Sequence, residues 1–397
     1  MLRIALKMLL GDRAKYVGLI FGISFTAFLI TFAGAFFAGF MTRGFALITE
    51  NGTADVWVMD PAVDSVEQTT NLPGWALDRV RGVAGVQSAV PLVLGTAEVR
   101  FANGRFQPVQ VIGVDDASLA GVPALRDGSA PTDLRLPDAV IVDAGGTSGK
   151  LGTPTLAADQ WPRGRPHLAA PTRELARGDE LLVNDHRVRV VGRAAGLPRF
   201  PPRPLLYTTV HNATRMLLPE RRRLTFVLAA AMPGVTAPEL AARIEARTGL
   251  RARTADDFKA DTVRWYLINS EDVGDVSTML ILALSVGFGV TGVMLYMFTS
   301  ENLRQYAVLS AMGATPRLLL AMIFTQAGLC ALLGTGLGIG LCGIASRLAV
   351  MAGFPFRMMW FTPVLGGVMV LLISVVAAAL SARPVLKLQP VVVFAGR

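Results

Sequence analysis

The sequence predicts an α-helical membrane protein with four transmembrane helices and a large α+β extracytoplasmic domain inserted between helices 1 and 2. Hydrophobic residues make up 52% of the 397 residues and charged residues 17%, and the mean hydropathy of +0.48 exceeds that of ordinary soluble domains. Four runs carry no charge and are longer than the roughly 20 residues that a bilayer core requires. The polar stretch 43–275 after the first run is too long for a connecting loop and predicts a folded domain.

The charge-free runs define the expected membrane helices, which are residues 16–42, 276–300, 318–346 and 358–382. The first run could be taken for a secretory signal. Its apolar part exceeds the roughly 7 to 15 residues of such a signal, and no small-residue cleavage site follows it cleanly. We therefore interpret it as a membrane helix.

The excess positive charge flanks these helices. The chain has 38 basic residues, of which 11 lie outside residues 16–300, and 29 acidic residues, of which 2 lie outside them. The inserted domain therefore has 27 residues of each charge. A neutral domain argues against nucleic-acid binding, which needs a basic patch. By the positive-inside rule both termini are cytoplasmic. The expected cytoplasmic parts are an amphipathic segment at 1–15, the connection 301–317 and the tail 383–397, and the expected outer parts are 43–275 and a short loop at 347–357.

Within the inserted domain, strands and helices alternate. Residues 53–60 predict a strand, 72–83 a helix, and 89–116 a hairpin with a type I′ turn at Asn103-Gly104. Residues 117–175 show little periodicity, and a second hairpin is expected to turn near Asn184-Asp185. A strand, a helix and a strand follow in 224–255, and a final helix from Asp256 is expected to run unbroken into the second membrane helix as a stalk.

The connection ENLRQYAVLSAMGATPR, residues 301–317, predicts a short helix that stops at Gly313, before a restart with Thr315 as N-cap and Pro316 in the first turn. A minimal connection would simply turn the chain around within a few residues. This one contains about three helical turns with few charges. We therefore predict that it docks on a cytoplasmic protein.

No residue pattern for chemistry stands out, so we assign no catalytic, cofactor-binding or metal residue. GGTSGKLG at 145–152 hints at a phosphate loop, but Leu151 occupies the place of the Ser or Thr that ligates Mg²⁺. The three histidines are scattered without metal-ligand spacing. GTGLGIG at 334–340 lies in an apolar run, which favours close helix packing over a dinucleotide site. The glycines assigned to membrane-helix packing are Gly18, Gly22, Gly334, Gly336, Gly338 and Gly340.

Three segments resemble a known family. Residues 301–329, ENLRQYAVLSAMGATPRLLLAMIFTQAGL, and the ending SARPVLKLQPVVVFAGR are similar to the MacB/FtsX family of ABC-transporter permeases. The opening ALKMLLGDRAKYVGLIFGISFTAFLI resembles the DevC-type permeases of heterocyst-glycolipid exporters. The chain departs from the family at Gln305 and Ser310, where the family usually has charged residues.

The resemblance implies a non-catalytic permease subunit of a mechanotransmission-type ABC exporter in the bacterial inner membrane, with two porter-like halves (about 43–116 and 216–265) and a β-rich subdomain (about 117–215) in the periplasm. ATP and Mg²⁺ would be bound by a partner ATPase. The other implied partners are a second permease copy, a periplasmic adaptor and an outer-membrane channel. The residues that would contact the ATPase are Glu301, Leu303, Arg304, Tyr306, Ala307, Ser310, Ala311, Gly313 and Thr315.

Two alternatives stay open. One is a lipoprotein-releasing permease of the same superfamily, which would need a lipid-accessible groove between the first and second membrane helices. The other is a signalling protein that passes a transmembrane signal to a kinase or hydrolase and moves no substrate.

Overall fold

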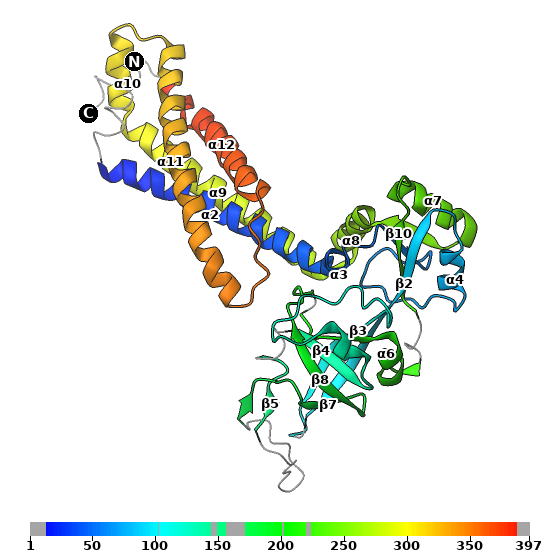
Figure 1. Cartoon of the computed structure of the whole chain (residues 1–397). Helices are drawn as coiled ribbons and strands as arrows, with labels where there is room; N and C mark the ends of the chain where they lie inside the picture. Colours follow the sequence, from blue (N-terminus) through cyan, green and yellow to red (C-terminus); the bar gives the residue numbers. More distant parts are fainter. Residues whose placement is uncertain are drawn as a thin grey trace. The chain divides into compact units, whose positions relative to one another are not determined.

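The computed structural model describes residues 13–101, 103–143, 149–155, 171–200, 202–219 and 224–386. These residues divide into two compact units, drawn in Figure 1. Unit 1 combines the chain up to Met41 with Ser270 onward, and unit 2 is Thr42–Asn269. The predicted segment 1–15 lies mostly outside the described residues, as does the tail from residue 387.

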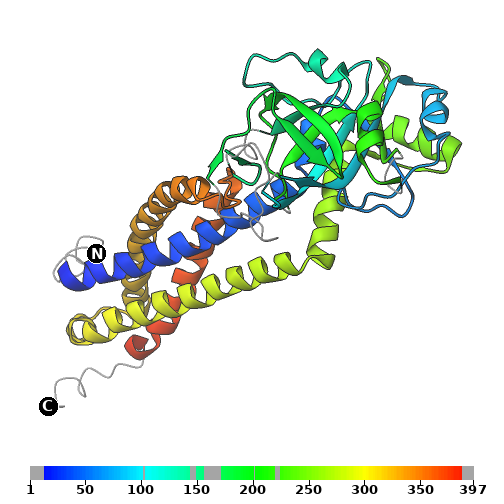
Figure 2. The same ribbon diagram turned by 90° about the horizontal axis from the view of Figure 1, so that it is seen from below.

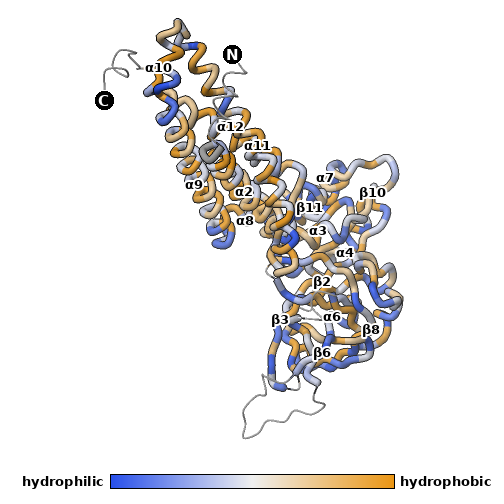
Figure 3. The backbone as a smooth tube through the Cα atoms, turned by 90° about the vertical axis from the view of Figure 1, so that its left-hand side faces the viewer, coloured by the Kyte–Doolittle hydropathy of each residue, from blue (hydrophilic) through white to orange (hydrophobic). Residues whose placement is uncertain are grey.

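Unit 1 is helical, and its long helices lie side by side in Figure 2. Four helical segments are long and apolar enough to cross a membrane, and orange predominates along them in Figure 3. The first three helices are longer than the predicted charge-free runs, because polar residues at their ends continue the helix. The fourth helix begins at Phe361, three residues later than predicted. The helices of unit 1 are α2 (Arg13–Gly44), α9 (Glu271–Glu301), α10 (Leu303–Ala311), α11 (Pro316–Met351), α12 (Phe361–Ser381) and α13 (Arg383–Leu386).

Helix α2 shares a core with the other three long helices of this bundle. Its residues Leu19, Ile23 and Ala27 are buried in a core that also contains side chains of α9, α11 and α12. Thr26 Oγ1 lies 3.2 Å from the carbonyl oxygen of Gly287 and 3.1 Å from Thr291 Oγ1, both on α9. Small residues at such crossings bring membrane helices close together.

The prediction of an unbroken helix from Asp256 into the second membrane helix is wrong. Helix α8 (Ala255–Asn269) ends one residue before α9 begins. Ser270 separates the two with extended dihedral angles, φ −97° and ψ 121°. Residues in this conformation cannot continue an α-helix, so the chain has a break where the sequence pattern was helical on both sides.

In unit 2, four antiparallel strands form one sheet in the order β11, β1, β10, β2. Helices α4 (Ala76–Arg81) and α7 (Ala237–Thr248) cover one face, where Val80 and Ile244 are fully buried. Helix α8 covers the other face, with Phe258 against Trp57 and Phe226. The strands are β1 (Val56–Met59), the first half of β2 (Val86–Arg100), β10 (Phe226–Ala231) and β11 (Arg251–Thr254).

The second half of β2 enters a closed barrel. The strand order is β2, β3, β9, β4, β8, β7, and β7 pairs back to β2 with Val99 opposite Val183. Its interior is filled by short branched side chains such as Val111 and Val190, which are fully buried and suit a narrow barrel. The added strands are β3 (Phe106–Val114), β4 (Ala139–Asp143), β7 (Glu180–Val183), β8 (His186–Ala194) and β9 (Leu205–Thr209).

Shorter elements complete unit 2. Helix α3 follows α2 directly, α6 follows β9, and a 3-10 helix precedes β4. Two short strands pair with each other beside the barrel, within the region of weak periodicity. These elements are α3 (Ala46–Glu50), η1 (Pro131–Arg135), β5 (Thr153–Pro154), β6 (Thr172–Arg173) and α6 (Val210–Met216).

Two sequence expectations for unit 2 need correction. The boundary near residue 117 is wrong, because β3 belongs to the barrel and the long strand β2 is shared by both sheets. The first hairpin forms, but not with a two-residue type I′ turn, because the Phe101 N–H donates to the carbonyl oxygen of Arg105 at 2.9 Å and so closes a longer loop, in which Gly104 has a positive φ (81°). In the second hairpin, Asn184 and Asp185 both have positive φ angles, 47° and 62°, as a type I′ turn requires.

Candidate functional site

Helix α10 is held at both ends by defined backbone turns. Asn302 separates it from α9 and donates from Nδ2 to the carbonyl oxygen of Phe298 at 2.7 Å. At the other end Gly313 has φ 93°, the Gly313 N–H donates to Ser310, and the Ala314 N–H donates to Leu309. This pair of bonds is a Schellman motif, which needs a left-handed residue at the position of Gly313. Thr315 then precedes α11, as predicted, although its side chain makes no capping bond.

The inner face of α10 is anchored to the bundle. Tyr306 and Ala307 are completely buried, and Tyr306 Oη donates to Gln326 Oε1 of α11 at 2.9 Å. Burial raises the pKa of Tyr306 to about 12, so the phenol stays protonated and keeps this bond at physiological pH. Movement of α10 is therefore tied to movement of α11.

The outer face of α10 is an exposed ridge. Arg304, Val308, Ala311 and Met312 are spaced at i, i+4, i+7 and i+8, so they share one side of the helix. Met312 is 72% exposed and Val308 40%. We call these four residues the α10 ridge. One cation followed by apolar side chains is a surface suited to a protein partner.

The structure places the predicted docking residues on two different sides. Glu301, Arg304, Ala311, Gly313 and Thr315 are exposed, Leu303 and Ser310 are half-buried, and Tyr306 and Ala307 face inward. The prediction that the small-residue face of the helix points to a partner is wrong for Tyr306 and Ala307. A helix that packs against a bundle turns its most apolar side toward the bundle. Val308 and Met312 were missed, although their spacing from Arg304 would have identified them.

The predicted packing glycines also separate into two groups. A Cβ at Gly334 would lie 2.7 Å from Ile23 of α2, a Cβ at Gly338 would meet the Ser24 carbonyl oxygen, and a Cβ at Gly22 would lie 3.2 Å from Met294 of α9. Around Gly18, Gly336 and Gly340 nothing described lies within 4 Å. The second group therefore has no packing role between the described helices.

Unit 2 contains a buried ion pair that the sequence did not suggest. Glu50, at the end of α3, and Arg199, in the loop after β8, have side chains only 5% and 4% exposed. The Glu50 carboxylate accepts from the Arg199 guanidinium, from the Leu197 N–H and from Tyr207 Oη, the last at 2.9 Å. Burial raises the pKa of Tyr207, which keeps it a donor. The helix that continues α2 is thereby fastened to the barrel.

Helix α8 is fastened to the same loop. Tyr266 Oη donates to the carbonyl oxygen of Phe200 at 3.3 Å, and the two rings lie 6.5 Å apart. The half-buried Glu67 faces Arg199 and Arg203, and burial raises its pKa to about 7 despite both cations. Loop 195–200 is thus bound by both helices through which the chain enters and leaves unit 2.

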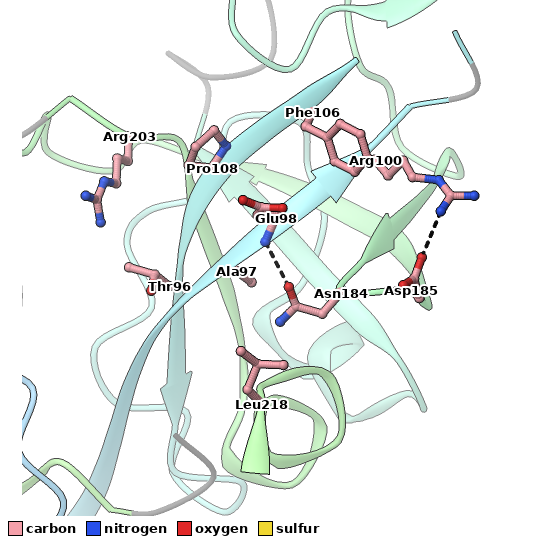
Figure 4. Close-up of a pocket in the computed structure, with 10 residues that line it drawn as sticks. All are labelled: Thr96, Ala97, Glu98, Arg100, Phe106, Pro108, Asn184, Asp185, Arg203 and Leu218. Atoms are coloured by element: carbon pink, nitrogen blue, oxygen red, sulfur yellow. Dashed lines mark hydrogen bonds and ion pairs between the residues drawn. The ribbon is translucent and has the colours of Figure 1, made fainter. Parts of the chain in front are cut away.

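A surface hollow of about 560 Å³ lies outside the barrel at the end of the β2–β3 hairpin (Figure 4). Two of its four charged side chains, Arg100 and Asp185, form an ion pair at 3.2 Å, and the Glu98 backbone N–H donates to Asn184 Oδ1 at 3.0 Å. Phe106 contributes an exposed ring. The hollow contains no nucleophile and base in contact, and the described residues contain no cluster of three metal-ligating side chains. Part of the 145–152 motif lies outside the described residues.

Comparisons with known proteins concern both units. Residues 277–390, from α9 to beyond α13, match the family described as FtsX-like permease C-terminal. This match spans under a third of the chain, and there the chain is similar to FtsX-like permeases. No curated protein matches the chain in sequence.

Parts of the chain are also similar to solved structures. The periplasmic region of MacB from Actinobacillus actinomycetemcomitans is 14% identical, with a TM-score of 0.36, over 56% of this chain and 96% of that one. The extracellular domain of YknZ, a noncanonic ABC-type transporter from Gram-positive bacteria, is 12% identical, with a TM-score of 0.31, over 51% and 98%.

Proposed function

We propose that the chain is the membrane-spanning permease subunit of an ABC exporter and that the α10 ridge docks on a separate ATPase. The observation that carries this proposal is the position of the ridge. It lies on a short helix between two membrane-length helices, inside the region similar to FtsX-like permeases. The inner face of α10 is committed to the bundle, so the ridge is the side left for a partner.

The sidedness follows from charge. The two end segments, residues 1–15 and 383–397, carry seven basic residues and one acidic residue, which favours a cytoplasmic location for both ends. An even number of spans then puts α10 in the cytoplasm and unit 2 outside it. ATP and Mg²⁺ would be bound by the partner, and this chain would transmit force.

The route of transmission runs along the chain. α10 follows α9 after a single residue, Asn302, and α9 follows α8 after a single residue, Ser270. The hydrogen bond from Tyr306 to Gln326 adds α11 to the same moving body. Nucleotide-driven displacement of α10 would thus reach unit 2 with little slack.

The proposed assembly contains two copies of this chain, and in an outer-membrane organism it would include a periplasmic adaptor and a channel, as in the DevC-type branch that the N-terminal segment resembles. An efflux assembly of this kind moves substrate from the periplasm. Unit 2 would then provide the moving surface.

The test is crosslinking from the ridge in native membranes. Cys330 and Cys342, both buried, are replaced, a single cysteine is introduced as Arg304→Cys, and the adduct is identified by mass. We expect a P-loop ATPase. The matched control is Met351→Cys, an exposed residue at the opposite end of α11, which should yield no ATPase. A kinase, a hydrolase or no adduct at Arg304→Cys would overturn the proposal and favour the signalling alternative.

The lipoprotein-releasing alternative needs a groove between α2 and α9. At their crossing these helices are in close contact through Thr26, Gly287 and Thr291. This contact favours export over extraction of lipidated cargo along that path.

A further inference from the structure

A hollow of about 360 Å³ opens on the surface of the helical bundle between α2 and α11. Its volume falls in the range of ligand pockets, roughly 300 to 1,000 Å³. Two stripes with helical i, i+3, i+4, i+7 spacing face each other across it. They are Phe21, Ser24, Phe25 and Phe28 on α2, and Leu341, Ile344, Ala345 and Leu348 on α11.

The shape of the hollow is fixed by the helix contacts beside it. The two helices touch at Gly334 and Gly338, where a Cβ would meet Ile23 and the Ser24 carbonyl oxygen. One wall is held by rings in sequence, since Phe28 lies 5.6 Å from Phe32 and Phe32 lies 4.9 Å from Phe356. The hollow is therefore preorganised.

Two arginines lie near one end of the hollow, and neither has an acidic partner in the part of the chain that the structure describes. Arg347 directly precedes Leu348 of the lining and, three residues from Ile344, is about 60° from it around the helix. Arg357 lies in the loop between α11 and α12, and its N–H donates to the carbonyl oxygen of Ala35 at 3.1 Å. Both side chains are exposed and form no ion pair with a described residue. The sequence contains no Asp or Glu after Glu301.

The same loop carries aromatic side chains of the kind found at membrane surfaces. Trp360 is 79% exposed and Phe354 54%. Trp residues concentrate at the level of lipid headgroups, and arginine binds phosphate through two parallel hydrogen bonds. The combination matches an anionic headgroup above an apolar chain.

We propose that this hollow binds an anionic phospholipid, with one acyl chain between the two stripes and the phosphate at Arg347 and Arg357. A helix of a second copy fits the lining less well, because membrane helix interfaces favour small residues and the hollow is lined mainly by Phe, Leu and Ile. Ser24 is the one polar lining residue, and its hydroxyl is buried and has no partner among the described residues.

The test uses the full-length protein in detergent micelles, with lipid adducts counted by native mass spectrometry. Phosphatidylglycerol and phosphatidylcholine of equal chain length are titrated separately, and inorganic phosphate is added as a competitor. We expect about tenfold tighter binding of phosphatidylglycerol, because the choline cation of phosphatidylcholine offsets the attraction of its phosphate to the two arginines. The double variant Arg347→Gln/Arg357→Gln should bring the two lipids to near parity.

A second variant addresses the acyl chain. Ala345→Phe fills the hollow and should reduce binding of both lipids, whereas the matched change Val364→Phe, on an exposed position of α12, should leave both unchanged. A photoreactive group on the acyl chain should label peptides containing residues 21–28 or 341–348.

Three outcomes would overturn the proposal. They are equal binding of both lipids by the unmodified protein, displacement of the lipid by millimolar inorganic phosphate alone, and a copy-to-copy disulfide from Phe25→Cys in a chain without Cys330 and Cys342. The last result would assign the hollow to a second copy.

Discussion

Glu50 shows how one residue can decide the stability of unit 2. Its carboxylate is buried against Arg199 and receives further hydrogen bonds from Tyr207 and from the Leu197 N–H. A buried pair of this kind adds little net stability compared with an apolar pair, because both charges have lost their water. Removing one partner is different, since it leaves the other charge buried and uncompensated.

We therefore expect Glu50→Gln to destabilise unit 2 by about 3 kcal/mol, and Glu50→Gln/Arg199→Met to recover much of the loss. The measurement is thermal unfolding of the full chain in detergent, together with hydrogen exchange of residues 46–51. Asp185→Asn, which breaks the exposed pair with Arg100, is the matched control and should cost less than about 1 kcal/mol. Equal losses from the buried and exposed changes would contradict the role assigned to burial.

At the scale of the element, α10 works as a docking helix because its ends are fixed. Gly313 adopts φ 93°, and a Cβ there would meet nothing within 4 Å. Any effect of a substitution at this position is therefore conformational and not steric. A residue with a side chain costs roughly 1 to 2 kcal/mol in this backbone region.

Gly313→Ala should loosen the last turn of α10 and lower the ATPase rate that the permease stimulates, while binding of the partner is weakened only a few-fold. Stimulated hydrolysis and hydrogen exchange of residues 309–314 measure this directly. The control is Gly178→Ala, with the same φ of 93° and open surroundings in unit 2. It should cost similar stability and leave stimulation unchanged. A normal rate with Gly313→Ala would show that the Schellman turn is dispensable for coupling.

The elements differ in how far the sequence predicts them. The four long helices are found within a few residues, because a charge-free run of that length has one common explanation. The barrel could not be predicted, since Val99 pairs with Val183 across more than 80 residues without a local signal. The buried Tyr306 hydroxyl bonds to Gln326 of another helix, a partner that no pattern within 301–317 contains.

At the scale of the whole molecule, the chain joins its two units at only two places. One is α2, which continues without a break from Met41 to Gly44, and the other is the break at Ser270. If α10 drives unit 2 through α9, two glycines inserted after Ser270 would add about 7 Å of slack and uncouple the units. We expect nucleotide to alter hydrogen exchange of loop 195–200 in the reconstituted complex and to leave it unchanged in this variant, with protection of α10 retained. The same insertion after the exposed turn at Gly128 should preserve the response. A response that survives the insertion after Ser270 would mean that α2 alone carries the movement.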